Sequence, residues 1–93
     1  MIKNTVVFDL DGTLIYEVGE KEDTPRYEVI DLFLSFQRFG CEMYLWSGGG
    51  EEYCDSWLKR LGLNAKVVEK GSFIPDIAVD NESCFLGKVN IRV

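Results

Sequence analysis

Four short apolar segments of this chain are each followed closely by a polar residue that can take part in chemistry. Between them, residues 24–39 and 51–61 repeat their apolar side chains at helical spacing. Strands that alternate with helices form a parallel sheet with right-handed crossovers, and ligands bind such sheets outside the carboxyl ends of the strands. The sequence therefore predicts one site at that edge. The segments and the polar residues after them are 5–8 with Asp9, 41–46 with Ser47, 65–68 with Lys70, and 77–79 with Asp80.

The order of these segments predicts a compact α/β domain with about five strands in a mainly parallel sheet. Residues 88–93 alternate in character and are predicted as a final edge strand, after a short turn or helix through Cys84 and the two residues that follow it. A chain of 93 residues builds one compact core, so we expect a single domain over residues 1–93.

Local signals refine the first half of the chain. Thr24 followed by Pro25 is a typical helix start, so the first helix is predicted over residues 24–39. The polar stretch 16–23, with a central glycine, is predicted as an exposed hairpin or loop and as the segment of the chain with the greatest mobility.

The charge and composition exclude several classes of protein. The formal net charge of -6 argues against a general nucleic-acid binder, because phosphate contacts require clustered Lys and Arg. No apolar stretch approaches the roughly 18 residues of a membrane span, and the first residues lack a signal-peptide pattern, so we expect a cytoplasmic protein. The chain has no histidine, which excludes Ser-His and Cys-His nucleophiles and His-containing zinc sites. Acid–base chemistry must then come from carboxylates, Lys or Tyr.

Two carboxylates flank Leu10 directly after the first apolar segment. Asp9 and Asp11 are two residues apart, so they can face one pocket just after a strand, and Gly12 permits a sharp turn behind them. A calcium loop or a simple turn is the alternative. An EF-hand loop follows a helix and has glycine at its sixth position, whereas here a strand precedes Asp9 and Leu14 is sixth.

These motifs resemble those of the haloacid dehalogenase superfamily of phosphotransferases. The first motif of that family is an apolar strand followed by Asp-x-Asp-Gly-Thr, and residues 6–14 read Val-Val-Phe-Asp-Leu-Asp-Gly-Thr-Leu. The second, an apolar strand ending in Ser or Thr, is similar to residues 43–47, and the last, an apolar strand ending in acids, is similar to residues 77–81. The resemblance covers almost the whole chain. It implies a three-layer, Rossmann-like fold with the strand that bears Asp9 at its centre.

The third motif of the family is a single lysine. Lys70 matches it best, Lys66 is the competitor, and Lys88 is a more distant candidate. The resemblance implies that this lysine binds phosphate together with the Ser47 hydroxyl and the Gly48 amide, at a helix start where N–H groups and the helix dipole favour an anion. Ser47 acting only as a helix cap is the alternative.

The resemblance also implies a double displacement at phosphorus. Asp9 would form an aspartyl phosphate, and Asp11 would protonate the leaving oxygen and then activate water. Mg²⁺ would be held by Asp9, Asp80 and the backbone carbonyl of Asp11, while Asn81, where many relatives have an acid, would orient a metal-bound water. Electrostatics independently favours a divalent cation, because neighbouring acids repel a phosphate dianion unless a cation and a lysine offset them.

The short chain is similar to the capless members of the family, since only residues 16–23 are available to cover the site. We expect a phosphomonoester phosphatase for a small phosphorylated substrate, with mobility of this segment or a homo-oligomer as the two ways to cover the open site. Two alternatives stay open. One is a phosphatase for nucleotide or polynucleotide ends, and the other is a non-enzymatic binding or regulatory module that retains the fold.

Overall fold

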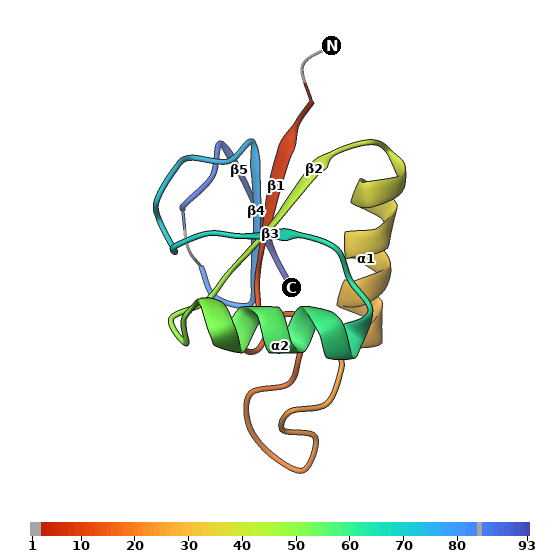
Figure 1. Cartoon of the computed structure of the whole chain (residues 1–93). Coiled ribbons are helices and arrows are strands. Elements are labelled where there is room, and N and C mark those ends of the chain that lie inside the picture. The colour runs from red at the N-terminus through yellow and green to blue at the C-terminus, as the bar shows by residue number, and fades with distance from the viewer. Residues whose placement is uncertain (1–2, 84) are drawn as a thin grey trace.

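The computed structural model of the chain describes residues 3–83 and 85–93 and contains one five-stranded sheet. All neighbouring strands are parallel, in the order β3-β2-β1-β4-β5 (Figure 1). The parallel α/β sheet, the central position of β1 and the edge strand near the C-terminus are confirmed. The turn or helix predicted through Cys84 falls at a position outside the described residues. The strands are β1 (Thr5–Asp9), β2 (Glu42–Trp46), β3 (Lys66–Val67), β4 (Ile77–Asp80) and β5 (Val89–Arg92).

Two helices connect the first three strands. They are α1 (Tyr27–Arg38), between β1 and β2, and α2 (Glu51–Leu61), between β2 and β3. α2 has its predicted range and ends at Gly62, whose φ of 68° is the left-handed conformation that glycine adopts most easily. No helix in the described part of the chain is long and apolar enough to cross a membrane.

The predicted start of the first helix at Thr24 is wrong, because α1 begins only at Tyr27. Ile15 and Pro25 form an isolated antiparallel bridge. The amide of Arg26 donates to the carbonyl of Leu14 over 2.8 Å, which holds the segment before α1 in an extended conformation. Tertiary pairing with the chain after β1 has therefore overridden the local helix-start signal.

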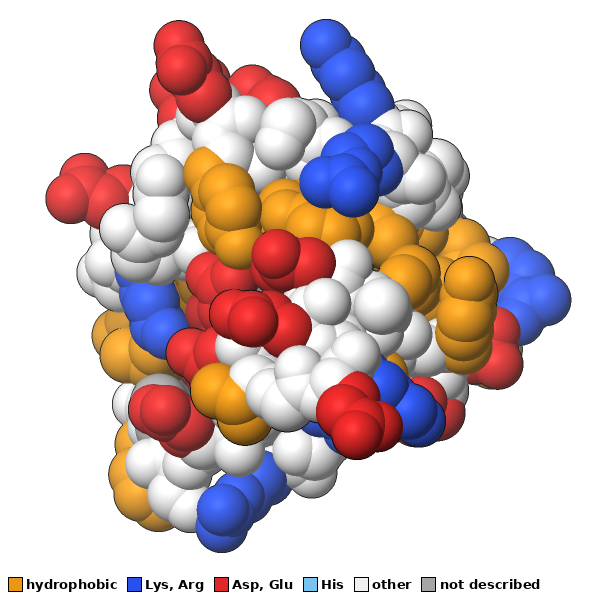
Figure 2. All heavy atoms as spheres, turned by 90° about the horizontal axis from the view of Figure 1, so that it is seen from below, with side chains coloured by type: hydrophobic (Ala, Val, Ile, Leu, Met, Phe, Trp, Pro, Cys, Tyr) orange, Lys and Arg blue, Asp and Glu red, His pale blue; other side chains and the backbone are white. Residues whose placement is uncertain are grey.

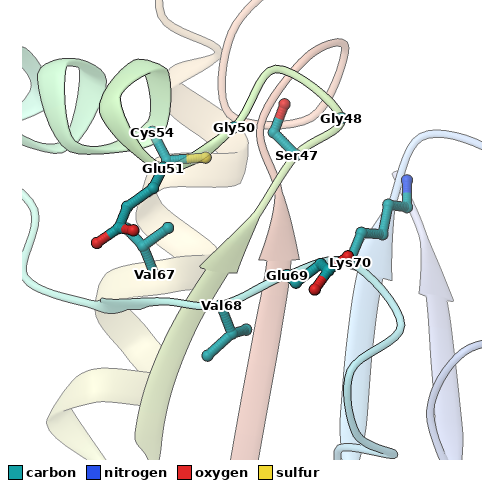
Figure 3. Close-up of a pocket in the computed structure, with 9 residues that line it drawn as sticks. All are labelled: Ser47, Gly48, Gly50, Glu51, Cys54, Val67, Val68, Glu69 and Lys70. Atoms are coloured by element: carbon teal, nitrogen blue, oxygen red, sulfur yellow. The ribbon is translucent and has the colours of Figure 1, made fainter.

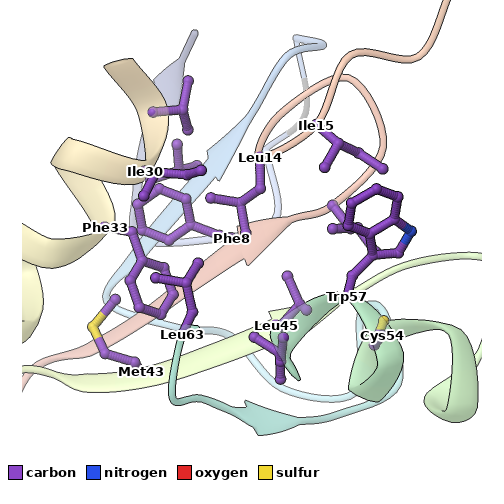
Figure 4. Close-up of a cluster of buried hydrophobic side chains, with 14 of the residues drawn as sticks. Phe8, Leu14, Ile15, Ile30, Phe33, Met43, Leu45, Cys54, Trp57 and Leu63 are labelled. Carbon is purple, nitrogen blue, oxygen red and sulfur yellow. The ribbon is translucent and has the colours of Figure 1, made fainter. Parts of the chain in front are cut away.

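Both helices pack on the same face of the sheet. Phe8 and Leu45 project from the strands into one buried cluster with Phe33 of α1 and Trp57 of α2 (Figure 4). The ring centroids of Phe8 and Phe33 are 5.1 Å apart. Right-handed crossovers that proceed in one direction along the sheet place successive helices on one face, as observed from β1 to β2 and from β2 to β3.

The opposite face is covered by coil, which corrects the three-layer expectation. The ring of Phe73, in the connection between β3 and β4, lies 5.0 Å from that of Tyr44 and 6.1 Å from that of Trp46. Within the described residues no helix lies on this face. The connection is short and contains Pro75, which does not favour a helical turn there.

The carboxyl ends of the strands, β1 included, face the lower edge of the molecule in Figure 1. Residues 16–23 extend from this edge as an exposed loop, as predicted. Figure 2 views the same edge from below and shows acidic side chains gathered near its centre. The fold therefore places a cluster of negative charge where a parallel sheet binds its ligands.

Candidate functional site

Two buried carboxylates lie side by side at the carboxyl ends of the central strands. Asp9 ends β1 and Asp80 ends the neighbouring β4, and each is only 6% exposed. Lys70 Nζ lies 3.4 Å from Asp9 Oδ1 and 3.4 Å from Asp80 Oδ2. One ammonium group therefore bridges both acids.

The charges at this point are incompletely balanced. The pKa of Asp9 is raised from 3.8 to about 6, because burial and the negative charge of Asp80 together raise it more than Lys70 lowers it. Desolvation lowers the pKa of Lys70, but the two carboxylates outweigh it and the net direction is upward. A single lysine thus offsets part of the negative charge, and the site retains an affinity for additional positive charge.

The structure places Lys70, rather than its two competitors, next to the acids. Lys66 is exposed within β3, in register with Tyr44. Lys88 pairs over 3.4 Å with Asp76, which precedes β4 and so lies at the amino end of the sheet. Lys70 reaches the site because it follows β3, where the chain crosses the carboxyl edge.

Asp11 is held by hydrogen bonds from two other elements. The Ser47 hydroxyl, directly after β2, donates to Asp11 Oδ2 over 3.0 Å, and the Tyr53 hydroxyl of α2 donates to Oδ1 over 2.6 Å. The Gly49 amide in turn donates to Ser47 Oγ over 3.0 Å. The N-cap of α2 is Gly50, so Ser47 does not cap this helix. Ser47 instead orients the second acid of the site.

Two residues of the site had no predicted role. Tyr53 belongs to the apolar stripe predicted for residues 51–61, yet its ring lies against Gly49, where a Cβ would come within 2.5 Å of it. Thr13 is fully buried. Its hydroxyl donates to Asp9 Oδ2 over 3.4 Å and accepts from the backbone N–H of Asn81 over 3.0 Å. In the sequence, the glycines before α2 were the signal that could have pointed to Tyr53, and the Thr of the first motif was the signal for Thr13.

Two further oxygen donors lie near the Asp80 carboxylate, namely the Asp9 carboxylate and the backbone carbonyl of Asp11. The Asn81 carboxamide nitrogen lies 3.3 Å from the backbone carbonyl of Asp11 and 3.1 Å from Asp80 Oδ1, in the orientation that satisfies its hydrogen bonds. No three His, Cys, Asp or Glu side chains of the described residues form a metal-binding cluster. Two carboxylates, of Asp9 and Asp80, and the Asp11 carbonyl nevertheless form a set of the type that Mg²⁺ prefers. The residues therefore fit this ion.

Gly12 is required in this arrangement for two reasons. Its φ of 78° favours glycine, and a Cβ at this position would lie 2.4 Å from the Asn81 side chain. The turn after β1 can thus approach the end of β4 only with glycine at this point.

Two adjoining cavities open at the carboxyl edge. The smaller, of about 260 Å³, is lined by the acids and also by Glu17 of the 16–23 loop. The larger, of about 440 Å³, lies between α2 and the chain after β3 and does not contain Asp9 or Asp80 (Figure 3). Gly48 and Lys70 line both.

The structure brings all of the predicted site residues to one edge of the sheet. They come from the ends of β1, β2 and β4 and from the connection after β3. Comparisons of the chain with models of known families, with curated proteins and with solved structures gave no match. The predicted site residues that lie at this edge of the sheet are Asp9, Asp11, Ser47, Gly48, Lys70, Asp80 and Asn81.

Proposed function

We propose that the chain is a Mg²⁺-dependent phosphomonoester phosphatase of the haloacid dehalogenase type, which acts through an aspartyl phosphate on Asp9. The observation that supports this best is the contact of a buried Asp9 with Lys70 beside Asp80, in a pocket that also contains Asp11. The parallel sheet with Asp9 on its central strand agrees with the Rossmann-like fold of that superfamily. The motif order along the chain supports the same proposal.

In the first step, a carboxylate oxygen of Asp9 attacks phosphorus, and the bond between phosphorus and the ester oxygen breaks. Asp11, in its protonated form, gives a proton to the departing oxygen, so that an alcohol leaves. In the second step, Asp11 takes a proton from water, whose oxygen attacks the phosphorus of the aspartyl phosphate. Inorganic phosphate leaves and the Asp9 carboxylate is restored.

The surrounding groups supply charge and orientation. Bound Mg²⁺, held by Asp9, Asp80 and the Asp11 carbonyl, would supply the positive charge that a phosphate dianion needs beside these acids. Lys70 contributes its ammonium to the phosphoryl oxygens, and the Gly48 amide borders the same pocket. Ser47 can exchange its hydrogen bond to Asp11 for one to a phosphoryl oxygen.

The test is release of phosphate from a panel of small phosphomonoesters, nucleotides included, with Mg²⁺ and with a chelator. We expect Mg²⁺-dependent release by the wild type and by Asp31→Asn, which alters an exposed acid on α1. Asp9→Asn should release no phosphate. Absence of release from every ester by folded, Mg²⁺-loaded wild type would contradict the proposal, and so would unchanged release by Asp9→Asn.

A further inference from the structure

The larger cavity is next to the proposed reaction site but has a different chemical character. Its volume of about 440 Å³ falls in the range of small-molecule sites, roughly 300–1,000 Å³. It shares Gly48 and Lys70 with the acid-lined pocket, so a molecule whose phosphate lies beside Lys70 can extend into it. A Cβ built at Gly48 meets no atom within 4 Å, so the space beside this shared residue is open.

The wall of the larger cavity is largely apolar. Val67 and Val68 lie on one side and Cys54 of α2 on the other (Figure 3). Cys54 is buried, and burial together with the charges of nearby Asp side chains raises the pKa of its thiol to about 11. The thiol is therefore neutral at physiological pH, and this wall favours a hydrocarbon group.

The charged groups of the cavity are mainly acidic. Glu51 and Glu69 line it and are exposed, and neither forms an ion pair with another described residue. Lys70 is the single cation among the described lining residues, and it is engaged with Asp9 and Asp80. The potential in the cavity is therefore negative, which favours a cationic ligand and disfavours a second anionic group.

We infer that this cavity binds the leaving-group part of the substrate, and that the preferred substrate is a phosphomonoester of an alcohol with a compact apolar body and a cationic end. The inference rests on the proposed function, because the phosphate is placed at Lys70. It excludes esters whose alcohol carries a carboxylate or further phosphates.

Two isosteric phosphonates test the inference without turnover, since a methylene group replaces their ester oxygen. One ends in a trimethylammonium group and the other in a tert-butyl group, so that they differ in charge and hardly in shape. Titration calorimetry of the Mg²⁺-loaded wild type gives both dissociation constants. We expect roughly fivefold tighter binding of the cationic phosphonate, as for a partly exposed ion pair.

Substitutions in the protein locate the effect. Glu69→Gln should reduce the preference for the cationic phosphonate about twofold, and Glu51→Gln should act in the same direction. Glu52→Gln is the matched control, because Glu52 is an exposed neighbour on α2 that does not line the cavity. The tert-butyl phosphonate should bind equally to all three variants.

Equal dissociation constants for the two phosphonates would overturn the inference, and so would a preference that Glu69→Gln and Glu52→Gln change equally. Turnover of the corresponding phosphate esters is measured separately. A charge preference without turnover would contradict the proposed function and leave the assigned cavity intact. Turnover without a charge preference would support the proposed function and contradict the role assigned to the cavity.

Discussion

The Tyr53 hydroxyl donates a 2.6 Å hydrogen bond to Asp11 Oδ1, and this bond links the first turns of α2 to the loop after β1. The bond to Asp11, burial and the Asp11 charge together raise the pKa of Tyr53 to about 12. Tyr53 therefore remains a donor throughout the physiological pH range. Together with Ser47 it fixes the Asp11 carboxylate at both oxygens.

Tyr53→Phe removes one of these two bonds. We expect kcat for an alkyl phosphate to fall about tenfold, because a hydrogen bond to a charged group is worth about 1.5–3 kcal/mol and Asp11 would lose its orientation. Steady-state kinetics measure the change. Tyr27→Phe, which alters an exposed tyrosine on α1, is the control and should retain wild-type kcat. Equal kcat for both variants would show that Tyr53 does not position Asp11.

Asp11→Asn separates the two steps of the proposed reaction. The variant keeps the backbone carbonyl of Asp11 but loses the proton that an alkoxide leaving group requires. Formation of the aspartyl phosphate should be far less impaired with an aryl phosphate, a good leaving group, than with an alkyl phosphate, while hydrolysis of the intermediate should be slow with both. Single-turnover kinetics on the two esters measure this. Equal impairment of the first step would mean that Asp11 is not the general acid.

Asp80 should carry much of the response to Mg²⁺. A cation that binds the folded state at about tenfold above its dissociation constant adds about 1.4 kcal/mol to the free energy of unfolding, so the thermal midpoint of the wild type should rise. Asp80→Ala should remove most of that rise, whereas Asp31→Ala should retain it. An undiminished rise in Asp80→Ala would exclude Asp80 as a ligand.

The raised pKa of Asp9 predicts how stability depends on pH in the presence of a chelator. Its folded-state pKa of about 6 lies above the ordinary value of 3.8, so the folded state binds more protons between these values. The contribution of this proton binding to the free energy of unfolding is fully present below pH 3.8 and is lost as pH rises through 6. It amounts in total to about 3 kcal/mol.

Asp9→Asn lacks that titration. Between pH 4 and pH 7 the free energy of unfolding should therefore fall in the chelated wild type relative to Asp9→Asn, by up to about 3 kcal/mol. Urea denaturation at the two pH values measures the difference. A constant difference between the two proteins would show that burial and Asp80 do not raise this pKa.

The elements that the sequence predicted well are those with strong local patterns. The apolar strands and the stripe of α2 carry their own periodicity. The central position of β1, which is observed, was implied only by the family resemblance of the motifs. The start of α1 was predicted wrongly because Pro25 pairs with Ile15, a contact that local propensity does not contain. The layer opposite the helices depends on Phe73 packing over Trp46, which only the tertiary structure reveals.

For the site, motif residues were predictable and their partners were not. Asp9 and Asp80 follow from their positions at strand ends, whereas the choice of Lys70 over Lys66 required the path of the chain after β3. Tyr53 was missed because its helical spacing is the same as that of a core residue, and its hydroxyl gives no periodic signal.

The central claim is that Asp9 becomes phosphorylated. The most direct measurement is intact-protein and peptide mass spectrometry of Mg²⁺-loaded Asp11→Asn, quenched in acid after reaction with an aryl phosphate. We expect one added phosphoryl group, located on Asp9, and none in the double variant Asp9→Asn/Asp11→Asn. Turnover of the ester by wild type, with no phosphoryl group on Asp9 in the Asp11→Asn protein at any quench time, would contradict the account.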